Sequence, residues 1–388
     1  MTHAKTNEPD SAISTDRVIG RYGGDTLGPT LVCITGLHGN EPAGVAAATR
    51  VLDYLHKHKP ALRGEFVALR GNLTALSRRE RYIDRDLNRQ WTQERLAALA
   101  APGDAPQSVE DREQIALNAA ISREIEHAPG RFFLLDVHTT SSVSAPFVIL
   151  HDSLRNRAFA RALCAPLVLG LEESLEGTIT DHFSERGGVC AAFECGRHDD
   201  AVSVELGEAA LWLGIRAADM LDAGDIPHIA EMRARIHAAA SGVPPVVEVL
   251  ARHALERGDA YVMRPGFRNF DIVRRGQALG LHNGHDVAAA ADSRVFMPLY
   301  QALGTEAFFL VQPVARFWLW LSGVVRRAGF SRIIGWLPGV RPHALRPRTF
   351  VVNPLIARIA VAEIFHLLGA REHESEHGRR VFSLRREE

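Results

Sequence analysis

Residues 31–41, LVCITGLHGNE, contain the pattern that decides the fold. The apolar run 31–37 does not alternate with polar residues, which is typical of a strand buried on both faces of a parallel sheet. His38 and Glu41 follow this run at once, and residues 41–56 have the apolar spacing of an amphipathic helix. The segment therefore predicts a buried strand that leads through a polar turn into a helix.

The alternation of strand and helix continues through the first 240 residues. Four more apolar runs predict strands, and three more stretches have helical spacing. The strands are expected at 65–69, 132–137, 147–150 and 189–193, and the helices at 108–127, 154–164 and 203–221. Because strands that alternate with helices pack helices on both faces of a sheet, we predict an α/β domain over residues 1–240, with a mostly parallel or mixed sheet.

The pattern changes in the last third of the chain. Short strand candidates separated by glycine and proline turns predict a smaller β-rich domain at 241–315. Helical spacing at 315–327 and 354–368 predicts a C-terminal helical extension over 316–388. The apolar run Phe317–Val325 is too short for a membrane span, which needs about 20 residues. We expect it to be a core or subunit-contact helix.

Composition excludes several classes of protein. The 388 residues are 46% hydrophobic and 23% charged, as in ordinary globular proteins, and the net charge is −1. No general basic field exists to hold nucleic acid or a membrane, so we expect neither partner. The four cysteines form no CxxC pair, and residues 1–15 lack the apolar core of a signal peptide. These features predict a soluble protein of the cytoplasm.

Three predicted strands end in residues suited to metal chemistry. The first is followed by His38 and Glu41, the third by His138, and the last by Glu194. In parallel α/β sheets, ligands bind outside the carboxyl ends of the strands. We therefore expect these four side chains to converge at one edge of the sheet. A lone HxxE occurs often by chance, and one buried histidine is usually a core residue, so the interpretation depends on this convergence.

Two imidazoles and one carboxylate, with a fourth position open, form a usual catalytic zinc site. His38, Glu41 and His138 are therefore predicted to bind one Zn²⁺ per chain, with Asp136 orienting a ligand from behind. Zinc lowers the pKa of its water from roughly 15.7 to about 7 and polarises a carbonyl. Glu194 follows a buried strand, and partial desolvation would raise its pKa toward the range useful for proton transfer.

Four blocks of sequence, in order, resemble the succinylglutamate desuccinylase/aspartoacylase family, whose members are related to the zinc carboxypeptidases. The blocks are ITGLHGNEPAG (34–44), RYIDRDLNRQW (81–91), LLDVHTTS (134–141) and FECG (193–196). The resemblance covers residues 30–200 clearly and continues more weakly through 264–280. It implies a zinc carboxypeptidase-like fold with a smaller β-rich C-terminal domain. The last 70 or so residues depart from the family pattern.

The resemblance also implies roles for individual residues. His38, Glu41 and His138 match the zinc ligands, and Glu194 matches the general base and acid. Arg81 matches an arginine that polarises the scissile carbonyl, and a fixed cation there would stabilise the developing oxyanion.

Asn88 and Arg89 match the pair that holds the substrate carboxylate, for which a guanidinium fork is well suited. Without the family pattern, this stretch would be interpreted as a solvated charged loop. Asp84 and Asp86 are expected to orient its arginines. Arg186 and Tyr300 stay open as substrate contacts.

We therefore expect a zinc-dependent hydrolase of amino-acid metabolism that cleaves the amide bond of a small N-acyl amino acid with a free carboxylate. A carboxypeptidase-like peptidase or an esterase with the same site is one alternative, and a non-catalytic metal-binding protein is another. The sequence does not identify the acyl group or the amino acid. The family resemblance is compatible with a homodimer.

Overall fold

The structure is a computed structural model. It describes residues 16–101, 106–256, 258–300, 305–330, 334–343, 346, 348–353, 365, 368–376 and 379–385. Its centre is a group of parallel strands paired in the order β3-β2-β4-β7. These strands are β2 (Thr30–Thr35), β3 (Glu65–Arg70), β4 (Phe132–Thr140) and β7 (Val189–Arg197).

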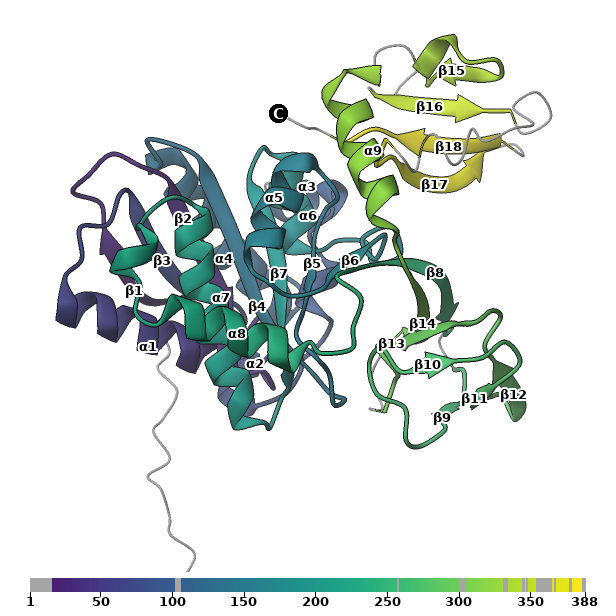
Figure 1. The fold of residues 1–388 in the computed structure, drawn as a ribbon, viewed down its shortest axis with the longest axis horizontal. Helices are drawn as coiled ribbons and strands as arrows, with labels where there is room; N and C mark the ends of the chain where they lie inside the picture. The colour runs from purple at the N-terminus through teal and green to yellow at the C-terminus, as the bar shows by residue number, and fades with distance from the viewer. Residues whose placement is uncertain are drawn as a thin grey trace, which may run out of the picture.

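Helices cover both faces of this sheet (Figure 1). One face packs against α1 (Ala43–His58), α5 (Leu154–Ala162), α7 (Ala201–Ala217) and α8 (Ile229–Ala239). The other packs against α2 (Leu73–Arg78), α3 (Gln93–Ala100), α4 (Val109–His127) and α6 (Ile179–Glu185).

The alternation of side chains along β2 explains why its four central residues, 31–34, are all apolar. Leu31 and Cys33 belong to the hydrophobic core on the α1 side, whereas Val32 and Ile34 belong to the core on the α4 side. Successive side chains of a strand point to opposite faces, so a strand covered on both sides has no position for a polar residue. The predicted α/β fold is confirmed.

Further strands extend the sheet to eleven, in the order β1-β3-β2-β4-β7-β5-β6-β8-β14-β13-β10. They are β1 (Val18–Gly23), β5 (Phe147–Ile149), β6 (Leu167–Leu169), β8 (Val246–Ala254), β10 (Ile272–Val273), β13 (Ser293–Phe296) and β14 (Glu306–Pro313). The strand β1 pairs antiparallel with β3. The sequence analysis did not predict it, because an edge strand is only partly buried and lacks a continuous apolar run.

The region from β8 to β14 is rich in strands, as expected. A three-stranded sheet of β9 (Tyr261–Met263), β11 (Ala278–His282) and β12 (His285–Ala288) stands beside the end of the large sheet (Figure 1). Because β8 pairs with both β6 and β14, the main sheet runs on into this region without a break. The domain boundaries at 240 and 315 stay a prediction.

The C-terminal tail contains a sheet where only helices were expected. After α9 (Arg316–Arg327) and η4 (Ile334–Trp336) come four antiparallel strands in the order β15-β16-β18-β17. They are β15 (Val340–Pro342), β16 (Thr349–Val352), β17 (Arg371–Glu376) and β18 (Arg379–Ser383). Charged β17 is an edge strand, which sequence patterning does not reveal. Most of the helix predicted at 354–368 lies outside the described residues.

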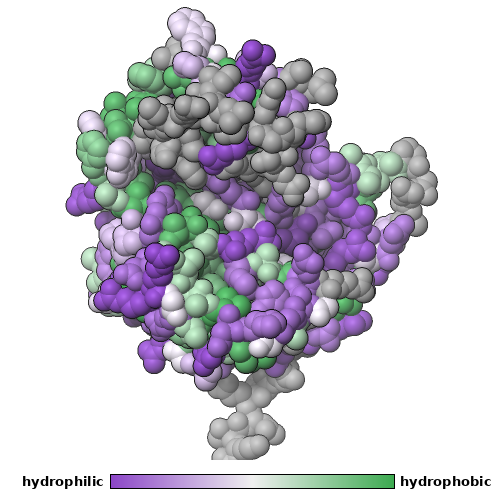
Figure 2. Space-filling view, turned by 90° about the vertical axis from the view of Figure 1, so that its right-hand side faces the viewer, coloured by the Kyte–Doolittle hydropathy of each residue, from purple (hydrophilic) through white to green (hydrophobic). Residues whose placement is uncertain are grey.

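The tail sheet and the β9–β12 sheet lie on the same side of the α/β body, one above the other in Figure 1. Figure 2 looks onto this side of the molecule. None of the helices within the described ranges combines the length and hydrophobicity that crossing a bilayer requires.

Candidate metal centre and active site

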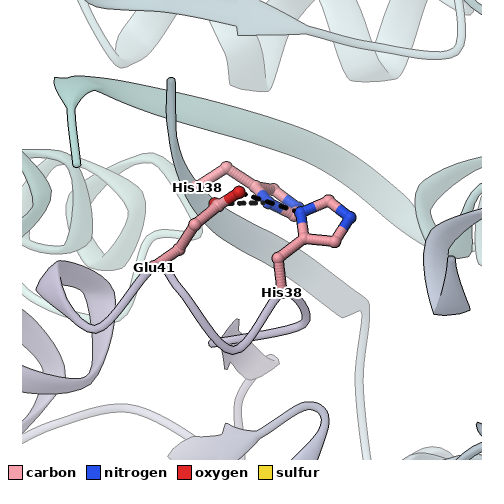
Figure 3. Close-up of side chains that lie close together, drawn as sticks. All are labelled: His38, Glu41 and His138. Carbon is pink, nitrogen blue, oxygen red and sulfur yellow. Dashed lines mark hydrogen bonds and ion pairs between the residues drawn. The ribbon is translucent and has the colours of Figure 1, made fainter. Parts of the chain in front are cut away.

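The loop between β2 and α1 and the end of β4 bring His38, Glu41 and His138 together (Figure 3). All three are buried, and one donor atom from each lies within 4.8 Å of the others. The Glu41 carboxylate lies between the two imidazoles, with Oε1 2.9 Å from His38 Nδ1 and Oε2 3.1 Å from His138 Nδ1. Among the described residues, no other His, Cys, Asp or Glu cluster has donor atoms this close.

A second layer of carboxylates holds the outer nitrogens of both histidines. His38 Nε2 lies 3.0 Å from Asp86 Oδ1, and His138 Nε2 lies 2.6 Å from Asp136 Oδ2. Metal-binding histidines characteristically bond a carboxylate through the nitrogen that does not face the metal. The donor set and its supporting carboxylates therefore fit a divalent metal such as zinc.

The electrostatics of this cluster keep its carboxylate charged. Burial opposes the charge on Glu41, but His38 and His138 outweigh it and hold the pKa of Glu41 well below its usual value. Burial likewise opposes the charge on His138, yet Asp136 and Glu41 hold the pKa of His138 well above its usual value. The carboxylates of Glu41, Asp86 and Asp136 surround the two imidazoles, and their negative charge favours the binding of a cation.

Glu194 lies on β7 as the register partner of His138 on β4. It is buried, and its Oε2 atom has no hydrogen-bond partner among the described residues. Burial raises the pKa of Glu194 to about 8, with Glu41 and Asp136 adding to the rise and His138 opposing it. A buried carboxyl group with a free oxygen and a pKa near neutrality is suited to general acid–base work.

Arg81 reaches the site from the loop that follows α2. Its guanidinium lies 2.9 Å from Asp86 Oδ2 and 3.7 Å from Glu41 Oε1. Burial lowers the pKa of Arg81, but Asp86 and Glu41 more than compensate, so the pKa is raised and the group stays cationic. Asp86 therefore orients both a histidine and an arginine, whereas the sequence predicted only the second of these contacts.

Close packing fixes the loop that carries His38. The backbone N–H of Gly39 donates to the Arg81 carbonyl at 3.2 Å. A Cβ at Gly39 would lie 2.0 Å from the backbone carbon of Ala75 in α2, closer than real atoms approach. Only glycine lets the β2–α1 loop and α2 approach this closely.

A cavity of about 360 Å³ opens onto the cluster. Six of the seven predicted site residues line it. They are His38, Glu41, Arg81, Arg89, His138 and Glu194.

His198 also lines the cavity and was missed. Its Nδ1 lies 2.7 Å from Thr139 Oγ1, and its buried Nε2 has no partner among the described residues. His198 lies four positions after Glu194, directly beyond the end of β7. Its closeness to Glu194 in the sequence was the one signal that could have pointed to it.

The lining of the cavity also includes apolar side chains, several of them from the β-rich region. Its apolar lining consists of Ile149, Leu175, Met297, Pro298, Leu299 and Phe309. Asn269 and Glu306 add polar groups from the same region.

Three candidate residues lie away from the cavity. Asn88 does not line it, and its Oδ1 accepts from the backbone N–H of Ile179 at 3.0 Å. Arg186 is exposed at the end of α6, with its guanidinium 5.8 Å from the centre of the Phe183 ring. The Tyr300 hydroxyl donates to the Arg264 carbonyl at 3.0 Å and so ties down a neighbouring loop.

Comparison with known proteins agrees with this geometry. Residues 27–224, which make up just over half of the chain, match the model of the succinylglutamate desuccinylase/aspartoacylase catalytic domain. The chain belongs to the succinylglutamate desuccinylase/aspartoacylase family. The resemblance of the four sequence blocks is thereby confirmed.

Curated relatives match over a shorter stretch. The chain is 32% identical over 121 residues to an N-acyl-aromatic-L-amino acid amidohydrolase (carboxylate-forming) of Xenopus tropicalis, covering 31% of this chain and 36% of that protein. It is 33% identical over 147 residues to the human protein of the same name, covering 37% and 43%. The aligned part thus spans less than half the length of these curated relatives.

Solved structures share the fold of the family. The succinylglutamate desuccinylase from Chromobacterium violaceum is 16% identical, with a TM-score of 0.53 over 76% of this chain and 88% of that one. A succinylglutamate desuccinylase/aspartoacylase from Rhodobacter sphaeroides is 19% identical, with a TM-score of 0.56 over 76% and 87%. The predicted fold class is confirmed.

Proposed function

We propose that this protein is a zinc-dependent amidohydrolase that cleaves a small N-acyl amino acid with a free carboxylate. The observation that carries the proposal is the convergence of His38, Glu41 and His138 beside Glu194, at the wall of a cavity that two arginines also line. The volume of about 360 Å³ falls within the range of roughly 300–1,000 Å³ that is usual for small-molecule sites.

His38, Glu41 and His138 would hold one zinc ion per chain. When bound, the ion supplies a Lewis acid and lowers the pKa of water. Glu194 takes the proton from the attacking water and passes it to the leaving nitrogen. Arg81, held by Asp86, stabilises the negative charge that develops on the carbonyl oxygen.

Arg89 is the cavity residue placed to bind the substrate carboxylate, since a guanidinium presents a planar fork to it. The predicted role of Asn88 in binding the substrate carboxylate stays a prediction. Its side-chain oxygen holds the backbone of Ile179, so Asn88 also has a positioning role.

The apolar part of the cavity lining favours a substrate with an apolar group. The amidohydrolases that this chain resembles act, by their names, on N-acyl-aromatic amino acids. We propose an N-acyl amino acid with an apolar side chain or acyl group as the first substrate class to test.

A carboxypeptidase-like peptidase or an esterase is the second candidate, because the same groups would attack either bond. Residues of the β-rich region, among them Asn269 and Met297, line the cavity and restrict the room for a peptide chain. A non-catalytic metal-binding role is the third candidate, and the buried, unpaired oxygen of Glu194 speaks against it.

The cytoplasm is the compartment we propose, because all four cysteines are free thiols, as is usual in a reducing environment. A homodimer stays a prediction.

The test is release of free amine from a panel of substrates by zinc-loaded protein, with and without a chelator. The panel contains N-acetyl and N-succinyl derivatives of aromatic, aliphatic and acidic amino acids, together with dipeptides and simple esters. Chelator-sensitive cleavage of an acylated amino acid supports the proposal. Cleavage of peptides or esters alone would favour the second candidate.

Replacing Glu194 by glutamine tests the mechanism in the same assay. The amide keeps the shape of the side chain but cannot take up the proton, so turnover should fall by about 10²–10⁴-fold. Zinc content, measured by metal analysis, should not change. A Glu194→Gln protein with undiminished turnover would contradict this role, and zinc-loaded wild-type protein that cleaves nothing would favour the non-catalytic alternative.

A further inference from the structure

The tryptophans divide into two classes by burial. Trp91 and Trp212 are 3% and 0% exposed and belong to the hydrophobic cores of the α/β body. Trp318, Trp320 and Trp336, all in the tail, are 56%, 62% and 86% exposed. Large apolar side chains grouped on a surface mark an interaction site more often than chance exposure.

The helix α9 carries a row of exposed apolar side chains along one face. Phe317, Trp320 and Val324 follow one another at helical spacing, and each is exposed. The opposite face is fixed to the α/β body, because Ser322 accepts from Arg157 at 3.2 Å and the buried Arg326 contacts the Asp152 segment. The exposed face is therefore held outward.

Figure 2 shows hydrophobic side chains gathered on the upper left of the face that it views, at the height where α9 lies in Figure 1, with hydrophilic side chains around them. Phe330 and Trp336, which follow α9, are also exposed. The sequence analysis expected the Phe317–Val325 run to be covered by the core or by another subunit. Within the described chain, nothing covers its outer face.

The chain segment that contains this surface is rich in arginine. Between Glu306 and Glu363 the sequence contains no acidic residue and eight arginines, although the whole chain has a net charge of −1. Five of them are exposed in the described part of the chain, whereas Arg326 is buried against Asp152. The exposed ones are Arg316, Arg327, Arg341, Arg346 and Arg348. Arg316 and Arg327 lie at the two ends of α9, and both are exposed.

We propose that the outer face of α9, together with the exposed Trp318 and Trp336, docks onto the surface of an anionic phospholipid bilayer. Exposed tryptophan and phenylalanine suit the boundary between headgroups and acyl chains, and neighbouring arginines suit anionic headgroups. A two-fold contact with a second copy would bring two arginine-rich, acid-free segments against each other, so the charge favours the lipid. This contact is peripheral and does not depend on the proposed hydrolase activity. It departs from the expectation that no membrane is bound, because that expectation used the net charge of the whole chain and not the local charge of the tail.

The test is cosedimentation of the full-length protein with vesicles of phosphatidylcholine alone and of an equimolar mixture of phosphatidylcholine and phosphatidylglycerol. The protein should sediment with the mixed vesicles, remain in solution with the neutral ones, and be released by high salt. Tryptophan emission should shift to shorter wavelength on binding, and brominated lipid should quench it.

The double variant Trp318→Ser, Trp320→Ser should lower the affinity for mixed vesicles by at least about tenfold, because it removes the apolar anchor. The matched control is Val262→Ser, Ile272→Ser, which removes two side chains of equal 65% exposure from the β-rich region. The control should bind as the wild type does. Unchanged thermal unfolding of both variants would show that they fold.

Three outcomes would overturn the proposal. The folded wild type could fail to bind mixed vesicles, or the tryptophan variant could bind as tightly as the control. Light scattering could also show a dimer that the tryptophan variant converts to a monomer, which would assign this face to a second copy.

Discussion

At the scale of single residues, Asp86 connects the metal-binding cluster to Arg81. One of its oxygens lies 3.0 Å from His38 Nε2, and the other accepts from Arg81 at 2.9 Å. Burial opposes the charge on Asp86, but His38 and Arg81 outweigh it and hold the pKa of Asp86 well below its usual value. A single carboxylate thus sets the orientation of a metal ligand and of the cation beside the reacting carbonyl.

Replacing Asp86 by asparagine should weaken zinc binding by about 10–100-fold, because the outer partner of a metal-binding histidine orients it and raises its basicity. Competition with a chromophoric chelator would measure the change. Asp84→Asn is the control, since Asp84 caps the start of α4 through the backbone N–H of Val109 and does not touch the cluster. Equal zinc affinity in the two variants would contradict the role of Asp86.

At the scale of elements, the start of α4 fixes the loop that carries the arginines. Glu110 is fully buried, and its carboxylate accepts from the backbone N–H groups of Ile83, Asp84 and Arg85 at 2.8, 3.0 and 3.3 Å. A buried loop backbone needs such acceptors, because unpaired N–H groups are costly away from water. Glu110 thereby positions the residues between Arg81 and Arg89 without lining the cavity.

Glu110→Gln should lower the free energy of unfolding by about 1–3 kcal/mol, because one acceptor oxygen is replaced by an amide that faces N–H donors. Urea unfolding measures this change, and a higher KM should accompany it as the arginine loop loosens. Glu126→Gln, at the exposed far end of the same helix, is the control and should behave as the wild type does. A Glu110→Gln protein of unchanged stability would refute the role given to this helix.

At the scale of the whole molecule, a buried ion cluster joins the tail to the α/β body. Arg326 of α9 lies 3.3 Å from Asp152, and Arg385 after β18 lies 2.8 Å from Glu172. Burial raises the pKa of Asp152, but Arg157 and Arg326 outweigh it and hold that pKa well below the usual value. Glu172 behaves in the opposite way, since burial raises its pKa to about 7 despite the nearby Arg385.

These shifts predict how stability depends on pH. The folded-state pKa of Asp152 is depressed, so its contribution is present above the ordinary value of 3.8 and is lost as the pH falls through and below it. The folded-state pKa of Glu172 is raised, so stability falls as the pH rises from 4.5 to about 7 and is level above that. The loss for Glu172 would be roughly 3 kcal/mol.

Urea unfolding of the wild type and of Glu172→Gln across this range checks the prediction. The wild type should lose stability relative to the variant as the pH rises toward 7, because the variant has no carboxyl group to ionise there. A constant difference between the two proteins at every pH would show that Glu172 does not titrate in the folded state.

Much of the site could be predicted from the sequence because its residues lie at or just beyond the ends of predicted strands. His38 and Glu41 follow one buried strand, and His138 and Glu194 lie near the carboxyl ends of two others, so the rule for parallel strands brings them to one edge. The position of Asn88 in the sequence, in contrast, does not reveal where its side chain points. It stands next to Arg89, yet its side chain turns to the backbone of Ile179, a partner 91 positions away.

The sequence by itself determined the α/β body and the metal-binding cluster, because apolar periodicity and strand ends are properties of neighbouring residues. Only the tertiary structure decided that Asp86 supports His38, that the tail forms a sheet, and that the tryptophans of α9 are exposed. These features depend on contacts between residues far apart in the chain, such as Arg326 with Asp152. No pattern within a single segment records such contacts, so they become visible only when the chain is folded.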